Sequence, residues 1–153
     1  MKQRSERPPR HSWFYDQLYL FNFRLVWPVT KSTLEQYIRD EFPDIGQEYI
    51  CEDDTFGGKA IFVPTEGRGG TYMVALRKWN GNSDDHSNLV HECLHVANMI
   101  LHHRDVQITP DNDEALTYLT QYIHRQCLNV LLPKRLRVSV DPTVIPKGLS
   151  KCR

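Results

Sequence analysis

Two long stretches of helical periodicity fill most of the second half of the chain and limit the folds open to it. The first runs from about residue 85 to 103 and the second from about 111 to 132. In each stretch apolar residues recur every three or four positions and form one apolar face. The loop between them, about 104–110, is short enough to make the two helices antiparallel neighbours. Pro133 ends the second helix.

The first half of the chain carries strand patterns around one short helix. Apolar and polar side chains alternate along residues 17–27, which is typical of a strand. Two further segments also have strand character, a short apolar run at 59–63 and residues 71–79. A capping box at Ser32 starts a helix that ends before Pro43. We expect 17–27 and 59–63 to be parallel across this helix, with 71–79 as an antiparallel hairpin partner. These patterns predict an α+β fold with a small mixed sheet of about three strands.

Length and composition fit one domain with a hydrophobic core. Of the 153 residues, 40% are hydrophobic and 25% are charged, which argues against a disordered chain. No apolar stretch is long enough to cross a bilayer, and no apolar run follows the basic start as it would in a secretory signal. The four cysteines form no C-x-x-C pair. The cysteine spacing and the missing secretory signal favour reduced thiols and a cytoplasmic protein. The missing apolar stretch predicts that the protein has no membrane partner.

Charge is distributed unevenly although the net charge is zero. Residues 1–10 carry a net charge of +3 and residues 133–153 one of +5, so the segment between them is acidic. We divide the chain into a basic N-terminal tail (1–12), a domain (13–132) and a basic extended C-terminal tail (133–153). The tails are either solvated ends or contacts for an acidic partner. Neither has a run of five basic residues, so nucleic acid is not the expected partner.

The segment His91-Glu92-Cys93-Leu94-His95 has the pattern H-E-x-x-H and lies within the first long helix. Residues four apart lie on one face, about one turn or ~6 Å apart, so both imidazoles can reach one zinc ion. Glu92 lies on the flank of that face, where we expect it to be partly exposed and to act as a general base. Cys93 falls on the opposite, apolar face and is expected to be a buried thiol. The pattern predicts Zn²⁺ as the cofactor.

A third zinc ligand is expected at the start of the second long helix. The metzincin pattern, with glycine and histidine three and six residues after the second histidine, fails because Asn98 and Leu101 stand there. A carboxylate on the next helix remains, and helical phase places Glu114 opposite the apolar face. Asp113 and Asp111 compete with it, and their simpler role is to cap the helix dipole. The predicted site is two histidines, Glu114 and one open position.

The motif and the carboxylate on the next helix resemble the gluzincin arrangement of zinc metallopeptidases. The segment from Asp113 to Leu119 is similar to small single-domain gluzincin-like proteins encoded by bacteriophages, and the likeness covers about residues 59–132. The resemblance implies a zincin-like fold, in which a small mixed sheet packs on the H-E-x-x-H helix and on a following glutamate helix.

The resemblance also implies roles for single residues. His91, His95 and Glu114 would be the metal ligands, and Glu92 would be the general base. Larger gluzincins often carry an aspartate one turn after the ligand glutamate to orient a histidine. This chain has Tyr118 at that position. The residue that would orient a ligand histidine therefore differs from the family pattern.

The predicted function is zinc-dependent hydrolysis of peptide bonds. The peptide or protein substrate is expected to extend along an edge strand of the sheet, which we assign to residues 71–79. The alternative is a zinc-stabilised structural or assembly protein of a phage virion or tail, without turnover, whose basic tails bind phage structural proteins or further copies of the chain. A third, weaker option is a peptidase that docks on nucleic acid through its tails. The enzyme would act in the host cytoplasm if phage-encoded, and the assembly protein would be part of the virion.

Overall fold

The computed structural model describes residues 9–16, 21–45, 56–65 and 69–136. The elements in these ranges are β1 (Arg10–Asp16), β2 (Phe21–Trp27), α1 (Lys31–Glu41), η1 (Pro43–Ile45), β3 (Gly58–Val63), β4 (Thr71–Leu76), α2 (Ser83–His102), α3 (Glu114–Leu131) and η2 (Lys134–Leu136). The fold is α+β, as the patterns predict. None of the helices in the described ranges is both long and apolar enough to cross a membrane.

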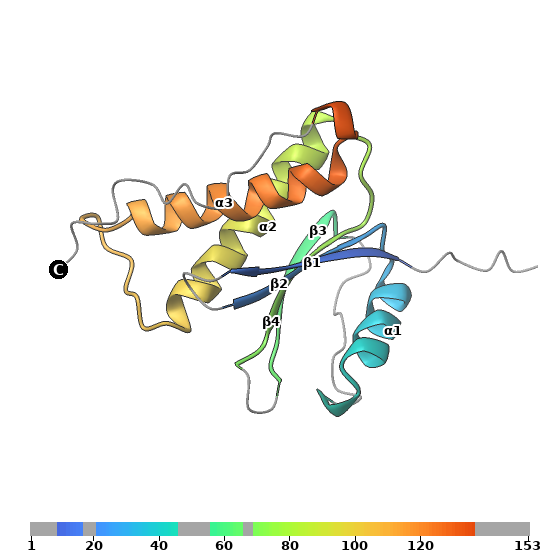
Figure 1. Ribbon diagram of the computed structural model, residues 1–153, viewed down its shortest axis with the longest axis horizontal. Helices are drawn as coiled ribbons and strands as arrows, with labels where there is room; N and C mark the ends of the chain where they lie inside the picture. The colour runs from blue at the N-terminus through green and yellow to red at the C-terminus, as the bar shows by residue number, and fades with distance from the viewer. Residues whose placement is uncertain (1–8, 17–20, 46–55, 66–68, 137–153) are drawn as a thin grey trace, which may run out of the picture.

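The four strands form one mixed sheet in the order β1–β2–β4–β3. β1 pairs with β2 and β3 pairs with β4, both antiparallel, while β2 and β4 are parallel (Figure 1). The hairpin of β3 and β4 confirms the prediction. The expectation that 17–27 and 59–63 would be parallel is wrong, because β4 lies between them. All six residues of β4 are buried, and a strand that is apolar on both faces is most stable in the interior of a sheet.

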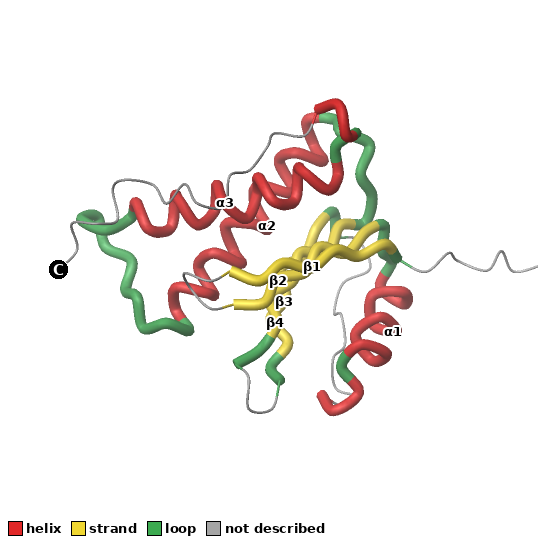
Figure 2. The backbone as a smooth tube through the Cα atoms, viewed as in Figure 1, coloured by secondary structure: helices red, strands yellow, loops and turns green. Residues whose placement is uncertain are grey.

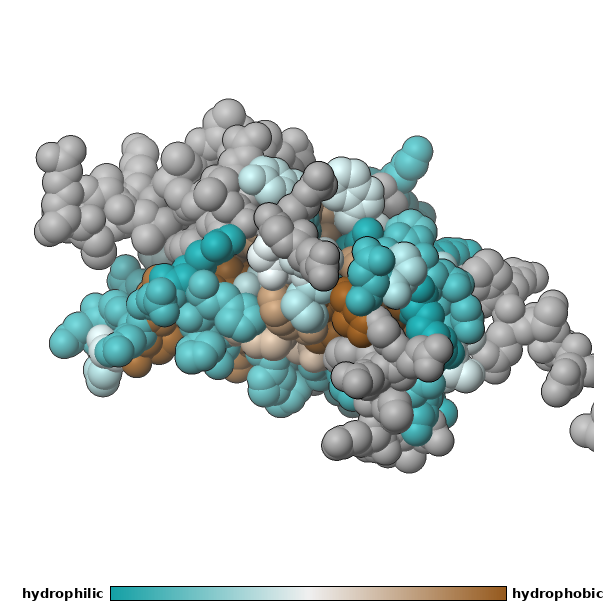
Figure 3. Space-filling view, turned by 90° about the horizontal axis from the view of Figure 1, so that it is seen from below, coloured by the Kyte–Doolittle hydropathy of each residue, from teal (hydrophilic) through white to brown (hydrophobic). Residues whose placement is uncertain are grey.

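Helices cover both faces of the sheet. α1 lies on one face, and α2 and α3 lie together on the other (Figures 1 and 2). Alternation along β2 produces the two layers, because Phe23 and Leu25 pack with α2 and α3 whereas Val26 packs with α1. Seen from below, the described surface is mainly hydrophilic, with a smaller apolar area near its middle (Figure 3). The larger of the two core clusters lies between the sheet and the layer of α2 and α3, and α2 carries the H-E-x-x-H motif.

Element boundaries differ from the predicted ones at several places. β1 begins at Arg10, ahead of the boundary placed at residue 13. The cap of α1 is Thr30 instead of Ser32: its side chain accepts a hydrogen bond from the Thr33 backbone N–H. Asn82 caps α2 through the backbone N–H of Asp85. α3 begins at Glu114, later than the predicted 111, because residues 110–113 form turns.

The predictions for the two tails fall almost wholly outside the described residues. These ranges omit 1–8 and 137–153, and also 17–20 at the start of a predicted strand. After Pro133 the described chain forms the single 3₁₀ turn η2 instead of an extended segment.

Candidate metal centre

His91 and His95 come together on the exposed face of α2. Their Nε2 atoms lie 3.0 Å apart, and the ring centroids are 4.5 Å apart with the planes nearly perpendicular. Two Zn–N bonds of ~2.0–2.1 Å at a tetrahedral angle would hold the nitrogens ~3.3 Å apart. The imidazoles are thus within a few tenths of an ångström of the separation that two ligands of one ion require. The i, i+4 spacing predicts this pairing correctly.

Glu92 is buried rather than partly exposed, which corrects the expectation from the sequence. Only 8% of the residue is exposed. The cause is edge strand β3, which starts directly against it. A Cβ atom added to Gly58 would lie 2.7 Å from Glu92 Cγ and 3.3 Å from a methyl group of Leu76. Helical phase alone cannot show this contact, because it comes from a strand far away in the sequence.

The carboxylate of Glu92 still meets solvent although its stem is covered. It forms no hydrogen bond or ion pair with any residue that the structure describes. Its two oxygen atoms are not fully enclosed by protein, so solvent can reach them. Packing restricts the rotamers of the stem and leaves the acceptor oxygens available. This is the arrangement that a general base needs.

Two consecutive glycines bring β3 this close to the helix. A Cβ at Gly57 would lie 2.6 Å from the side-chain amide nitrogen of Asn88, one turn before Glu92 on α2. The backbone is held there because the Arg77 N–H donates to the Gly57 carbonyl over 3.1 Å. Sequence reasoning missed these glycines. The signal available was their position immediately before a short apolar strand.

Two apolar side chains border the histidines on the flank opposite Glu92. Val90 and Leu94 are each 43% exposed, and at ~100° per residue both lie on the far side of His91 from Glu92. The histidine face of α2 therefore has strand β3 and a carboxylate on one flank and an apolar border on the other.

Glu114 does not join the histidines in this structure. It is the first residue of α3 and is exposed, next to Asp113, which forms no side-chain cap. Within the described ranges no group of three or more His, Cys, Asp or Glu side chains is placed to hold a metal ion. The assignment of Glu114 as third ligand, with Asp113 and Asp111 as competitors, stays a prediction.

α3 packs on the apolar face of α2. Leu119, Ile123 and Cys127 of α3 share one core cluster with Cys93 and the other apolar residues of α2. That face of α2 is opposite the one that carries the histidines. Cys93 is fully buried, as predicted, and lies in the same core cluster as Cys127. Burial raises the pKa of the Cys127 thiol well above its ordinary value, and the contact with Cys93 adds to the shift.

Comparisons of the chain with protein-family models, with curated proteins and with solved structures found no match. A functional proposal therefore depends on the geometry of the histidine pair and its surroundings.

Proposed function

We propose that the protein is a zinc-dependent peptidase with a zincin-like fold, in which His91 and His95 supply two metal ligands and Glu92 is the general base. The observation that carries the proposal is the convergence of two exposed imidazoles, with Nε2 atoms 3.0 Å apart, beside a glutamate whose stem is fixed by an edge strand. A catalytic zinc site needs a third protein ligand. Glu114 is our candidate, and it would have to approach the histidines on metal binding.

Zinc in such a site polarises a carbonyl and lowers the pKa of a bound water to ~7. The residues of the chain do the rest. Glu92 accepts the proton of the attacking water and passes it to the leaving amine. The contact with Gly58 keeps the carboxylate on one flank of the histidine pair throughout.

The substrate strand would extend along β3 rather than along residues 71–79. β4 is hydrogen-bonded on both sides, whereas among the residues that the structure describes β3 pairs with β4 alone. The free edge of β3 can accept an extended peptide through backbone hydrogen bonds. Since β3 starts beside Glu92, a peptide on this edge passes the general base, and Val90 and Leu94 offer apolar contact on the other flank.

The experiment measures zinc content and hydrolysis together. Purified protein should hold about one zinc per chain and cleave internally quenched peptides in a chelator-sensitive way. His95→Ala should lose both properties, whereas His102→Ala, an exposed histidine further along the same helix, should keep both. Glu92→Gln should keep zinc and lose at least ~100-fold in rate. Hydrolysis that survives in Glu92→Gln would overturn the proposed mechanism.

The assembly protein without turnover is the competing proposal. Its support is the charge of the tails, which lies mostly outside the described residues. Stoichiometric zinc with no hydrolysis of any peptide in a broad library, together with a high-mass complex that is lost on deletion of residues 1–8 and 137–153, would favour it.

A further inference from the structure

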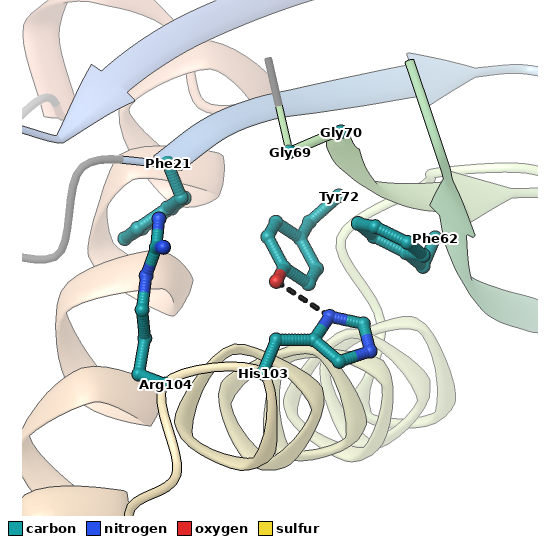
Figure 4. Close-up of a pocket in the computed structure, with 7 residues that line it drawn as sticks. All are labelled: Phe21, Phe62, Gly69, Gly70, Tyr72, His103 and Arg104. Atoms are coloured by element: carbon teal, nitrogen blue, oxygen red, sulfur yellow. Dashed lines mark hydrogen bonds between the residues drawn. The ribbon is translucent and has the colours of Figure 1, made fainter. Parts of the chain in front are cut away.

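A pocket lies at the C-terminal end of α2, away from the histidine pair in the middle of that helix. It has a volume of about 310 Å³, at the lower end of the range for small-molecule pockets. Its walls come from the start of β2, the end of β3, the start of β4 and the C-terminal end of α2 (Figure 4). His103, which caps α2, is eight residues beyond His95, about 12 Å along the helix axis. The two sites are therefore separate.

A hydrogen-bonded pair lies in the middle of this pocket. Tyr72 Oη and His103 Nδ1 are 2.7 Å apart, and Figure 4 shows the Tyr72 hydroxyl pointing at the imidazole. When His103 carries its proton on Nδ1, it donates to the tyrosine oxygen. The tyrosine hydroxyl is then able to donate its own proton to a third group. Arg104 lies on the same side of the pocket as Phe21 and adds a permanent positive charge.

Aromatic rings form the remaining walls. Phe62 lies with its ring centroid 4.9 Å from that of Tyr72 and 4.4 Å from that of His103. Phe21 meets Tyr72 edge to face at 6.0 Å. A Cβ atom on Gly70 would overlap the Phe62 ring, so only glycine allows the backbone to close the pocket on this side. Tyr72 packs between Phe21 and Phe62, so the half-buried Phe62 is the flat, apolar wall that can contact a planar group.

We infer that this pocket binds a small organic anion in which a planar ring carries a carboxylate or a phosphate. The oxyanion would accept hydrogen bonds from the Tyr72 hydroxyl and the Arg104 guanidinium, and the ring would lie against the half-buried Phe62. The pocket does not involve the histidine pair, so this inference is independent of the proposed peptidase activity.

The test is a titration of the full-length, ¹⁵N-labelled protein in the presence of a metal chelator. The probes are benzoate, phenyl phosphate, benzyl alcohol and inorganic phosphate. At least one of the two aromatic anions should perturb the amides of Gly69, Tyr72 and His103, and should bind at least ten-fold more tightly than either benzyl alcohol or inorganic phosphate. The two anions compared with each other show whether the site prefers a carboxylate or a phosphate.

Variants decide which residues recognise the anion. Tyr72→Phe, which removes only the hydroxyl, and Arg104→Gln should each weaken the preferred anion about five- to ten-fold. Arg39→Gln, on α1 at the opposite face of the sheet, should leave the affinity unchanged. The amide spectrum of each variant without ligand shows whether it is folded. If Tyr72→Phe does not fold, the affinity of Arg104→Gln decides the result, because Arg104 is exposed and its replacement should not affect folding. Benzyl alcohol binding as tightly as both anions, perturbations confined to other regions, or equal losses in Arg104→Gln and Arg39→Gln would each overturn the inference.

Discussion

Gly58 on edge strand β3 touches Glu92 on α2 so closely that a single added Cβ atom would lie 2.7 Å from Glu92 Cγ. This contact joins the edge of the sheet to the glutamate of the H-E-x-x-H motif. It fixes the side chain that we propose as general base, and it places the free edge of β3 beside the histidine pair.

The first prediction compares the two glycines at the start of β3. Gly58→Ala forces Glu92 Cγ or the strand to move, and overpacking of this kind costs ~1–3 kcal/mol of unfolding free energy. Gly57→Ala meets only the amide end of Asn88, which is exposed and can rotate, so its cost should be smaller. Urea unfolding of both variants measures the difference. Equal losses of stability would contradict the contact as described.

The second prediction concerns the third zinc ligand. Glu114→Ala should weaken zinc binding ~10- to 100-fold if this carboxylate approaches the histidines on metal binding, whereas Asp113→Ala should not. Competition with a chromophoric chelator measures both affinities. The reverse order would transfer the role to Asp113, and no effect from either variant would remove the first turn of α3 from the site.

The third prediction concerns pH and the start of α2. The backbone N–H groups of Asn80 and Gly81 donate to the buried Asp85 carboxylate, with that of Asn80 contributing most, and these hydrogen bonds lower its pKa. A depressed pKa in the folded state gives stability that is present above the unfolded pKa of ~3.9 and is lost as pH falls through the folded pKa.

Asp85→Asn should therefore be less stable than the unmodified protein at pH 7, and the difference should shrink as the pH falls below ~3.9. Chemical unfolding at a series of pH values checks this. Asp84→Asn, at an exposed neighbouring position, is the control and should change stability little. If the free energies of unfolding of Asp85→Asn and of the unmodified protein differ by the same amount at every pH, the carboxylate is not the source of the difference.

The fourth prediction concerns the thiols between α2 and α3. Cys93 and Cys127 have no exposed surface, and burial raises the pKa of Cys127, which disfavours the reactive thiolate. In a variant with Cys51 and Cys152 replaced by serine, neither remaining thiol should react with Ellman's reagent at pH 8 until guanidinium unfolds the protein. Rapid labelling of the native protein would show that α3 does not stay packed on α2.

Features determined by neighbours in the sequence were predictable, and those determined by distant contacts were not. The i, i+4 spacing gives the approach of His91 to His95, and helical phase gives the burial of Cys93. The burial of Glu92 depends on a strand that is more than 30 residues earlier, and the second pocket combines residues from four elements. Neither leaves a local pattern in the sequence.

The order of the strands was unpredictable for a similar reason. A crossover through α1 can place either β3 or β4 beside β2, and only the complete burial of β4 selects the second arrangement. β1 shows no apolar/polar alternation, because Phe14 faces the core while Trp13 and Tyr15, on the other face, are 65% and 51% exposed. Its aromatic side chains therefore do not follow the usual rule that large apolar residues mark the core.

The parallel pairing of β2 with β4 also has a consequence for how the chain reaches this structure. Asn22 pairs with Thr71, so forming the centre of the sheet closes a loop of about fifty residues, an entropic cost that local contacts do not carry. The β1–β2 and β3–β4 pairs join nearby segments and can form earlier. Until the two hairpins meet, β4 presents unpaired backbone N–H and C=O groups and mostly apolar side chains to other copies of the chain. Aggregation during refolding should therefore rise steeply with protein concentration and originate from this strand.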